Sequence, residues 1–188
     1  MSMNFFLINY IRKKHHFGRY KIVKALIAGH GKELLDIGCG SPAKCVKPGS
    51  FLRTAGYGQG IDIVPCKLEF PFKIGNMENI PFENKKFDVI TAIEVIEHVD
   101  KPKKALDEVY RVLKDQGVFI MTTPNNNLLF RSFWCIWERT VGKEWKDTHL
   151  SPLTKSDWLG MIKKSNKFKI EKVIDYWGIN LIFKIRKI

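Results

Sequence analysis

The sequence contains few cysteines, and no two of them have the spacing of a metal-binding or redox pair. They are Cys39, Cys45, Cys66 and Cys135, and none belongs to a C-x-x-C motif. We therefore expect free thiols in a reducing compartment, and from this a cytoplasmic location.

Long apolar runs are missing as well. The longest falls well short of the roughly 18 residues that a membrane-spanning helix needs. The apolar stretch 4–11 precedes the basic residues Arg12, Lys13 and Lys14, whereas a secretory leader carries its basic residues first. We expect neither a transmembrane helix nor a signal peptide.

Two phosphate-binding motifs are absent. No G-K-[ST] occurs, which excludes a P-loop, and Gly38-Cys39-Gly40 lacks the third glycine, at position 43, that a dinucleotide fingerprint requires.

Acidic residues are scarce, since 19 Asp and Glu face 32 Lys and Arg and the net charge is +13. This excess suits an anionic partner such as nucleic acid, a phosphorylated substrate or an anionic membrane surface. A general enrichment in lysine is the alternative, because the lysines are scattered along the chain.

Short apolar runs alternate with helical patterns along most of the chain. The expected strands are 33–37, 60–63, 72–75, 87–93, 117–123, 168–176 and 179–185, and the expected helices are 51–55, 102–113 and 154–164. The last two strands are close enough to form an antiparallel hairpin. This order predicts an α/β fold whose sheet is mostly parallel, with one antiparallel strand at or near an edge.

Two segments flank this pattern. Residues 1–28 show helical spacing at Ile22, Ala25 and Leu26, with Gly18 as a break, and they predict either a helix packed on the sheet or a basic cap over a cleft. Residues 125–150 are long for a connection and rich in aromatics, which predicts a lid or acceptor segment.

The ends of three expected strands carry polar groups. Asp36 precedes the Gly38-Cys39-Gly40 turn, where glycines let a ligand approach the backbone, and Asp62 ends the second strand. A carboxylate in that place can accept both hydroxyls of a ribose, while Asp36 could hold a cationic amino group. After the third strand, the Asn76 amide could bond an adenine edge and the Met77 thioether could cover its face. Together these groups describe a site for a nucleoside with an amino-acid tail.

At this point the chain resembles the class I S-adenosylmethionine-dependent methyltransferases. The resemblance lies in LLDIGCGSP, GIDI, GNMENIPFENKKFDVITAIEVIEHVDKPKKALDEVYRVLK and GVFIMTTPN, in family order. It implies a Rossmann-like, doubly wound sheet with helices on both faces, and S-adenosylmethionine as cofactor with S-adenosylhomocysteine as product. It says little about the acceptor.

The resemblance also assigns residues. Asp36, Gly38, Cys39 and Gly40 match the loop that holds the methionine part of the cofactor. Asp62 and Ile63 match the ribose site, Asn76 and Met77 the adenine site, and Glu94 the wall between cofactor and acceptor. Two departures are Pro42, where many members have glycine, and residues 64–73, which are too short and proline-broken for a full crossover helix.

The run Glu94-Val95-Ile96-Glu97-His98 could ligate a divalent ion. It resembles the Glu-x-x-Glu-His of ubiquinone-biosynthesis and small-RNA methyltransferases, where a downstream histidine completes the site, as His149 would here. The alternative, which we adopt with no metal assigned, makes Glu97 and His98 structural groups at a helix start.

Other candidates lie outside this run. His149 suits a general base because a histidine pKa lies near neutral pH, or it is a loop residue bonded to backbone. His15 and His16 belong to a basic run and are expected to be solvated. Trp134 and Trp137 share a helical face and are expected to pack within the lid.

These observations favour a single methyltransferase domain. Its expected parts are a helical cap (1–28), a cofactor-binding core (29–124), an aromatic lid or acceptor segment (125–150) and a C-terminal helix and hairpin (151–188). The catalytic candidates are Glu94 and His149, and the expected acceptor is a small or lipid-like molecule. An RNA methyltransferase and a non-catalytic cofactor-binding subunit are the alternatives, and the oligomeric state stays open.

Overall fold

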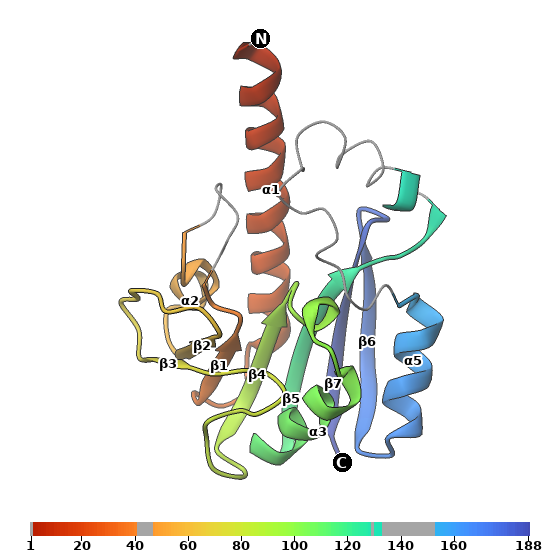
Figure 1. The fold of residues 1–188 in the computed structure, drawn as a ribbon. Coiled ribbons are helices and arrows are strands. Elements are labelled where there is room, and N and C mark those ends of the chain that lie inside the picture. The colour runs from red at the N-terminus through yellow and green to blue at the C-terminus, as the bar shows by residue number, and fades with distance from the viewer. Residues whose placement is uncertain (1, 41–46, 129, 133–152) are drawn as a thin grey trace.

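A seven-stranded sheet forms the centre of the molecule (Figure 1). This computed structural model describes residues 2–40, 47–128, 130–132 and 153–188, with residues 2–9 described as backbone only. The strands are β1 (Leu34–Ile37), β2 (Gln59–Asp62), β3 (Phe72–Ile74), β4 (Phe87–Ile93), β5 (Leu113–Pro124), β6 (Phe168–Tyr176) and β7 (Asn180–Lys187). Their order is β3-β2-β1-β4-β5-β7-β6. Strand β7 runs in the opposite direction to the other six strands. The prediction of a mostly parallel sheet with a C-terminal antiparallel hairpin is therefore confirmed.

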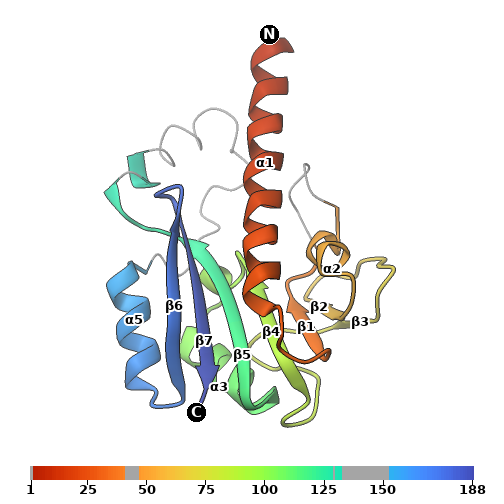
Figure 2. The ribbon, with the colours of Figure 1, turned by 180° about the vertical axis from the view of Figure 1, so that it is seen from behind.

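Helices cover both faces of the sheet (Figures 1 and 2). The helices are α1 (Ser2–Ile27), α2 (Ser50–Ala55), η1 (Ile96–His98), α3 (Pro102–Val112) and α5 (Lys155–Lys164). The first two share an apolar cluster on one face, and the other three share a second cluster on the opposite face. The fold therefore has three layers, as a doubly wound sheet requires.

Strand β5 is apolar without alternation because both of its faces are covered. Val118 and Ile120 point into the cluster under α1 and α2, whereas Phe119 and Met121 point into the cluster under α3 and α5. All four side chains are fully buried. A strand covered on both faces reads as a continuous apolar run, which is the pattern that predicted it.

Helix α1 passes through Gly18 without interruption, so the expected break at this residue is wrong. A Cβ atom at Gly18 would lie 2.4 Å from the Tyr176 hydroxyl oxygen. That hydroxyl donates a hydrogen bond to the carbonyl oxygen of His15, at 3.2 Å. The glycine is therefore required by close packing of β6 on the helix and not by a turn.

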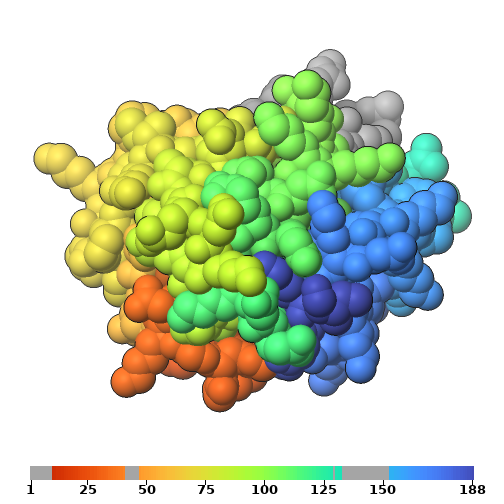
Figure 3. All heavy atoms as spheres, turned by 90° about the horizontal axis from the view of Figure 1, so that it is seen from below, coloured from red at the N-terminus to blue at the C-terminus, as the bar shows by residue number. Residues whose placement is uncertain are grey.

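The buried face of α1 also differs from the expected one. Tyr20, Val23 and Ile27 are buried against the sheet and α2, whereas Ala25 is exposed. The amino-terminal half of the helix projects beyond the edge formed by the carboxyl ends of the parallel strands (Figures 1 and 2). The opposite end of the molecule is closed by residues from the connections that precede the strands (Figure 3).

Three other expectations are confirmed. Residues 63–71 contain no helix, so β2 and β3 lack a helical crossover. The predicted helix 102–113 forms α3, which ends at Val112, and its buried residues are Ala105, Leu106, Val109 and Val112. The β6–β7 turn has positive φ at both Trp177 (60°) and Gly178 (72°), as tight hairpin turns do.

Candidate functional site

The candidate site begins with a buried acid on β1. Asp36 lies opposite Thr91 of β4 in the sheet, and the Thr91 hydroxyl donates a 2.7 Å hydrogen bond to its carboxylate. Only 4% of Asp36 is exposed. Burial raises its pKa to about 7, while the Thr91 hydrogen bond lowers it in part and Asp62 raises it further.

The glycine turn follows at the end of β1. The N–H groups of Gly38 and Cys39 donate to the Ile61 carbonyl oxygen, at 2.8 and 3.2 Å, which ties the turn to β2. Gly38 has a φ of +72°, and a Cβ atom there would lie 2.3 Å from Val95 Cγ2. Any other residue here would be strained in the left-handed region and would displace the Val95 side chain.

Asp62 lies across from this turn, half-buried at the end of β2. Its carboxylate oxygens accept hydrogen bonds from the N–H groups of Gly40 and Val64, both at 2.9 Å. A Cβ atom at Gly40 would lie 2.9 Å from the nearer oxygen, so the glycine allows this close approach. The acid is thus held at the mouth of the turn, with lone pairs left to accept further hydrogen bonds.

The residues after β3 occupy different environments. Asn76 is exposed, and its side-chain oxygen accepts from the Glu78 N–H at 2.8 Å. Met77 is 2% exposed and packs in the core cluster beneath α3. Ile63, one residue past Asp62, is 69% exposed. Asn76 and Ile63 are thus exposed near the carboxyl end of the sheet, whereas the Met77 side chain packs into the core and does not stand open to cover an adenine face as the sequence suggested.

Glu94, just past β4, has a left-handed backbone with φ of 57°. Its carboxylate accepts hydrogen bonds from the Thr122 hydroxyl of β5 and from the Asn180 amide of β7, both at 2.7 Å. An Arg19 guanidinium nitrogen lies 3.4 Å from the same carboxylate. Arg19 comes from α1, so the Glu94 side chain is fixed at the edge of the sheet by three separate elements: β5, β7 and α1.

The histidines of α1 are not solvated, so that expectation is wrong. His15 packs against the rings of Tyr176 and Trp177, whose centroids are 4.9 and 5.1 Å from its own. Burial lowers its pKa to about 4, with a further lowering from Arg19. His16 accepts a 3.0 Å hydrogen bond from Arg19, and burial lowers its pKa to about 3.

Glu97 and His98 form part of η1. Glu97 is 2% exposed, and neither of its carboxylate oxygens has a hydrogen-bond partner. Burial, followed by the nearby charge of Glu94, raises its pKa well above the ordinary value. In the described part of the chain, no group of three or more His, Cys, Asp or Glu side chains is placed to hold a metal ion.

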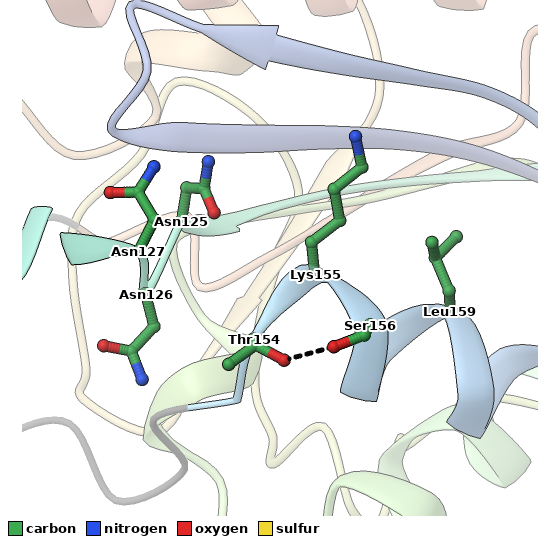
Figure 4. Close-up of a pocket in the computed structure, with 7 residues that line it drawn as sticks. All are labelled: Asn125, Asn126, Asn127, Thr154, Lys155, Ser156 and Leu159. Carbon is green, nitrogen blue, oxygen red and sulfur yellow. Dashed lines mark hydrogen bonds between the residues drawn. The ribbon is translucent and has the colours of Figure 1, made fainter. Parts of the chain in front are cut away.

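A second feature lies beside the sheet edge, where an open depression of about 430 Å³ separates the end of β5 from the start of α5 (Figure 4). It is lined by Asn125, Asn126, Asn127, Thr154, Lys155, Ser156 and Leu159. Thr154 caps α5 in a capping box with Asp157, which satisfies the first backbone N–H groups of that helix.

Several predicted residues lie outside the described residues. They are His149, Trp134, Trp137 and most of the aromatic segment. Sequence reasoning in turn missed Arg19, Thr91 and Asn180, the partners that hold the predicted acids. Thr91 offered one signal, because it is a polar residue inside the otherwise apolar run 89–93.

Comparison with known proteins identifies this arrangement. Residues 35–121 match a family model described as a methyltransferase domain, and they span β1 to β5 with Asp36, Asp62 and Glu94. Over residues 35–121 the chain therefore matches a class I, S-adenosylmethionine-dependent methyltransferase domain.

Related proteins cover this methyltransferase domain to different extents. An uncharacterised protein of Methanocaldococcus jannaschii is 38% identical over 103 residues, which are 50% of this chain and 38% of that protein. A ubiquinone biosynthesis O-methyltransferase of Pelagibacter ubique is 30% identical over 149 residues, 74% of this chain and 59% of that enzyme. The chain thus spans less than two thirds of the length of either relative.

A solved structure shares the fold over nearly the whole methyltransferase chain. It is a Thermotoga maritima S-adenosylmethionine-dependent methyltransferase, described as a possible histamine N-methyltransferase, with a TM-score of 0.74 and 18% identity. The match covers 98% of this chain and 96% of that one. Among the described residues, no helix of this methyltransferase has the length and apolarity needed to cross a bilayer.

Proposed function

We propose that this chain transfers a methyl group from S-adenosylmethionine to a small or lipid-like acceptor. The observation that carries the proposal is the meeting of Asp36, the glycine turn and Asp62 at one edge of the sheet. Ligands of doubly wound sheets bind at the carboxyl ends of the strands, which is where these groups lie.

The residues of this edge fit each part of the cofactor. Asp62 would accept hydrogen bonds from the ribose hydroxyls, because its half-buried carboxylate is fixed by two backbone donors and still has free lone pairs. The turn at Gly38, Cys39 and Gly40 would hold the methionine part, with Asp36 beneath it. Asn76 and the backbone of Met77 would border the adenine. When bound, S-adenosylmethionine supplies an electrophilic methyl group on a positively charged sulfur.

The protein contributes position more than strong acid or base chemistry. Glu94 is held by Thr122, Asn180 and Arg19, so its carboxylate has one orientation at the wall between cofactor and acceptor. It would orient the acceptor or accept its proton, and His149 is the second candidate for that proton.

The acceptor site would lie between α1 and residues 125–150. His15 and Arg19 place α1 against Glu94, which supports a role of this helix as a cap. A lipid-like acceptor is supported by the name of the Pelagibacter relative, a ubiquinone biosynthesis enzyme, and by the exposed apolar residues at this end of the molecule.

Calorimetry with S-adenosylmethionine and S-adenosylhomocysteine tests cofactor binding. We expect both to bind, and Asp62→Ala to weaken binding at least about tenfold because charge-assisted hydrogen bonds are lost. Asp107→Ala, an exposed acid on α3, serves as the matched control and should leave affinity unchanged. Absence of binding to either ligand would overturn the proposal.

The acceptor can then be sought with labelled S-adenosylmethionine in lipid, small-molecule and RNA extracts. Transfer of label into the lipid or small-molecule fraction supports the proposed acceptor class. Label in RNA alone would replace it with an RNA methyltransferase.

A further inference from the structure

Helix α1 has an unusual charge pattern for a helix that packs on a domain. Every charged residue between Ser2 and Ile27 is basic, and the first acidic residue of the chain is Glu33. The helix therefore has no intrahelical ion pairs to balance its positive charge. Its carboxyl-terminal half packs on the domain through Tyr20, Val23 and Ile27.

One exposed face of α1, the lysine–aromatic face, combines this charge with large apolar side chains. It consists of Tyr10, Lys13, Lys14, Phe17 and Lys21, at the three- and four-residue spacing that aligns side chains along a helix. Tyr10 is 57% exposed and Phe17 is 45% exposed. Among the described residues, no carboxylate forms an ion pair with its three lysines.

Other exposed apolar side chains lie at the same end of the molecule. Ile63 and Val64 follow β2, Leu128 follows β5, and Trp177 lies in the turn after β6. Because β2, β5 and β6 run in the same direction, these residues share the edge beyond which α1 projects (Figures 1 and 2).

We propose that this end of the molecule docks on an anionic membrane surface, with the projecting half of α1 and its lysine–aromatic face reaching into the headgroup region. Lysines near an anionic leaflet are attracted by its surface potential, and Tyr and Trp are the side chains that favour the membrane–water interface. The binding would be peripheral, through one helix face and the apolar residues around it.

The apolar residues favour a lipid surface over nucleic acid as the occupant. Phosphate backbones attract lysines equally well, but they give no apolar phase for Leu128, Ile63 and Val64, which are 79%, 69% and 60% exposed. A bilayer interface provides both the negative charge and the apolar phase.

The docked orientation places the candidate active site at the membrane. Asp62 and Glu94 lie at the edge from which α1 projects, so the acceptor site would face the lipid. This part rests on the proposed methyl transfer and assigns its acceptor to molecules dissolved in the bilayer. The docking itself does not depend on activity.

Co-sedimentation with vesicles tests the docking. We expect the protein to bind phosphatidylcholine vesicles that contain phosphatidylglycerol, to bind pure phosphatidylcholine much less, and to dissociate as salt rises. Lys13→Glu with Lys14→Glu should weaken binding at least about 25-fold, since each lysine near the surface contributes about fivefold. Phe17→Ala should weaken binding while the salt dependence remains.

A charge-matched control separates this face from the overall charge. Lys163 and Lys164 are neighbouring exposed lysines in the last turn of α5, close to where β6 begins at the other end of the molecule, and replacing both by Glu changes the net charge by the same amount. We expect this control to bind vesicles as the unaltered protein does. Equal loss in both variants, no preference for phosphatidylglycerol, or binding of RNA without binding of vesicles would each overturn the proposal.

Binding of S-adenosylhomocysteine, measured on the same variants, keeps the two proposals distinct. Unchanged cofactor affinity in the Lys13→Glu, Lys14→Glu protein shows that the fold is intact and that lost vesicle binding reflects the altered face. A protein that binds vesicles but no cofactor would refute methyl transfer and leave the docking standing.

Discussion

Replacing Asp36 by Asn should stabilise the protein without cofactor, and increasingly so as pH rises. Asp36 is buried at the bottom of the glycine turn, and burial raises its pKa from 3.8 to about 7. Asparagine has the same shape and no charge, and it can keep a hydrogen bond with the Thr91 hydroxyl.

The sign follows from the two pKa values. Below pH 3.8 the carboxyl group is protonated in both the folded and the unfolded chain, so pH has no effect through this group. Between pH 3.8 and 7 the unfolded chain releases the proton while the folded chain keeps it, which favours unfolding. Above pH 7 both states are ionised, and the cost to folding stays at its maximum.

The magnitude comes from the size of the shift. About three pKa units correspond to an upper bound of about 4 kcal/mol in the free energy of unfolding. For a chain of this size, each kcal/mol shifts the melting temperature by about 2–4 °C. We therefore expect the melting temperature of Asp36→Asn to exceed that of the unaltered protein by several degrees at pH 8 and by little at pH 4.

Thermal melts at several pH values between 4 and 8 measure this difference. Asp88→Asn is a control of opposite sign, because the pKa of Asp88 is lowered: burial would raise it, but hydrogen bonds from Lys114 and the Glu33 N–H outweigh burial. That variant should lose stability above pH 4. A loss of stability in Asp36→Asn, or a gain that does not change with pH, would refute the reasoning.

The remaining predictions concern packing, capping and the second buried acid. Gly18→Ala should lower the melting temperature because its Cβ displaces the Tyr176 hydroxyl, although alanine favours helices by about 1 kcal/mol. Adding Tyr176→Phe should restore stability, and a Gly18→Ala protein more stable than the parent would contradict this prediction. Glu97→Gln should stabilise the protein more at pH 8 than at pH 5, since burial raises the pKa of Glu97; equal melting shifts at both pH values would show that this carboxyl is not the titrating group. Thr154→Ala should cost about 1 kcal/mol in urea unfolding because the capping box of α5 is lost, and an unchanged midpoint would mean that the cap is replaced.

The strands and their order could be predicted because both faces of the sheet are covered. Continuous apolar runs such as 87–93 and 117–123 have few other stable environments, and their alternation with helical patterns leaves one kind of sheet. The candidate acids followed in the same way, since Asp36 and Asp62 stand directly at strand ends.

The partners of those acids could not be predicted. Arg19 and Glu94 are far apart in the sequence, and so are Glu94 and Asn180; each pair meets only once α1, β4 and β7 have packed together. Local composition also gave wrong expectations for His15 and Gly18. Beside Lys13 and Lys14, His15 looks solvated, yet the β6–β7 hairpin folds over it, and Gly18 looks like a helix end until Tyr176 is placed above it.

The position of β7 has a consequence for how the chain assembles. Strand β7 is made after β6 but lies between β6 and β5 in the sheet. Its Lys187 also donates hydrogen bonds to the carbonyl oxygens of Tyr110 and Leu113, where α3 ends. Until residues 180–187 have left the ribosome, the long apolar strand β5 has an open edge and β6 has no partner.

Such an edge is a template for pairing with other chains. Synthesis of this protein therefore passes through a stage in which the first five strands can pair among themselves but the sheet cannot close. We expect any slowing of translation before residues 180–187 emerge to increase aggregation of the nascent chain, which pulse-labelling of ribosome-bound intermediates would detect.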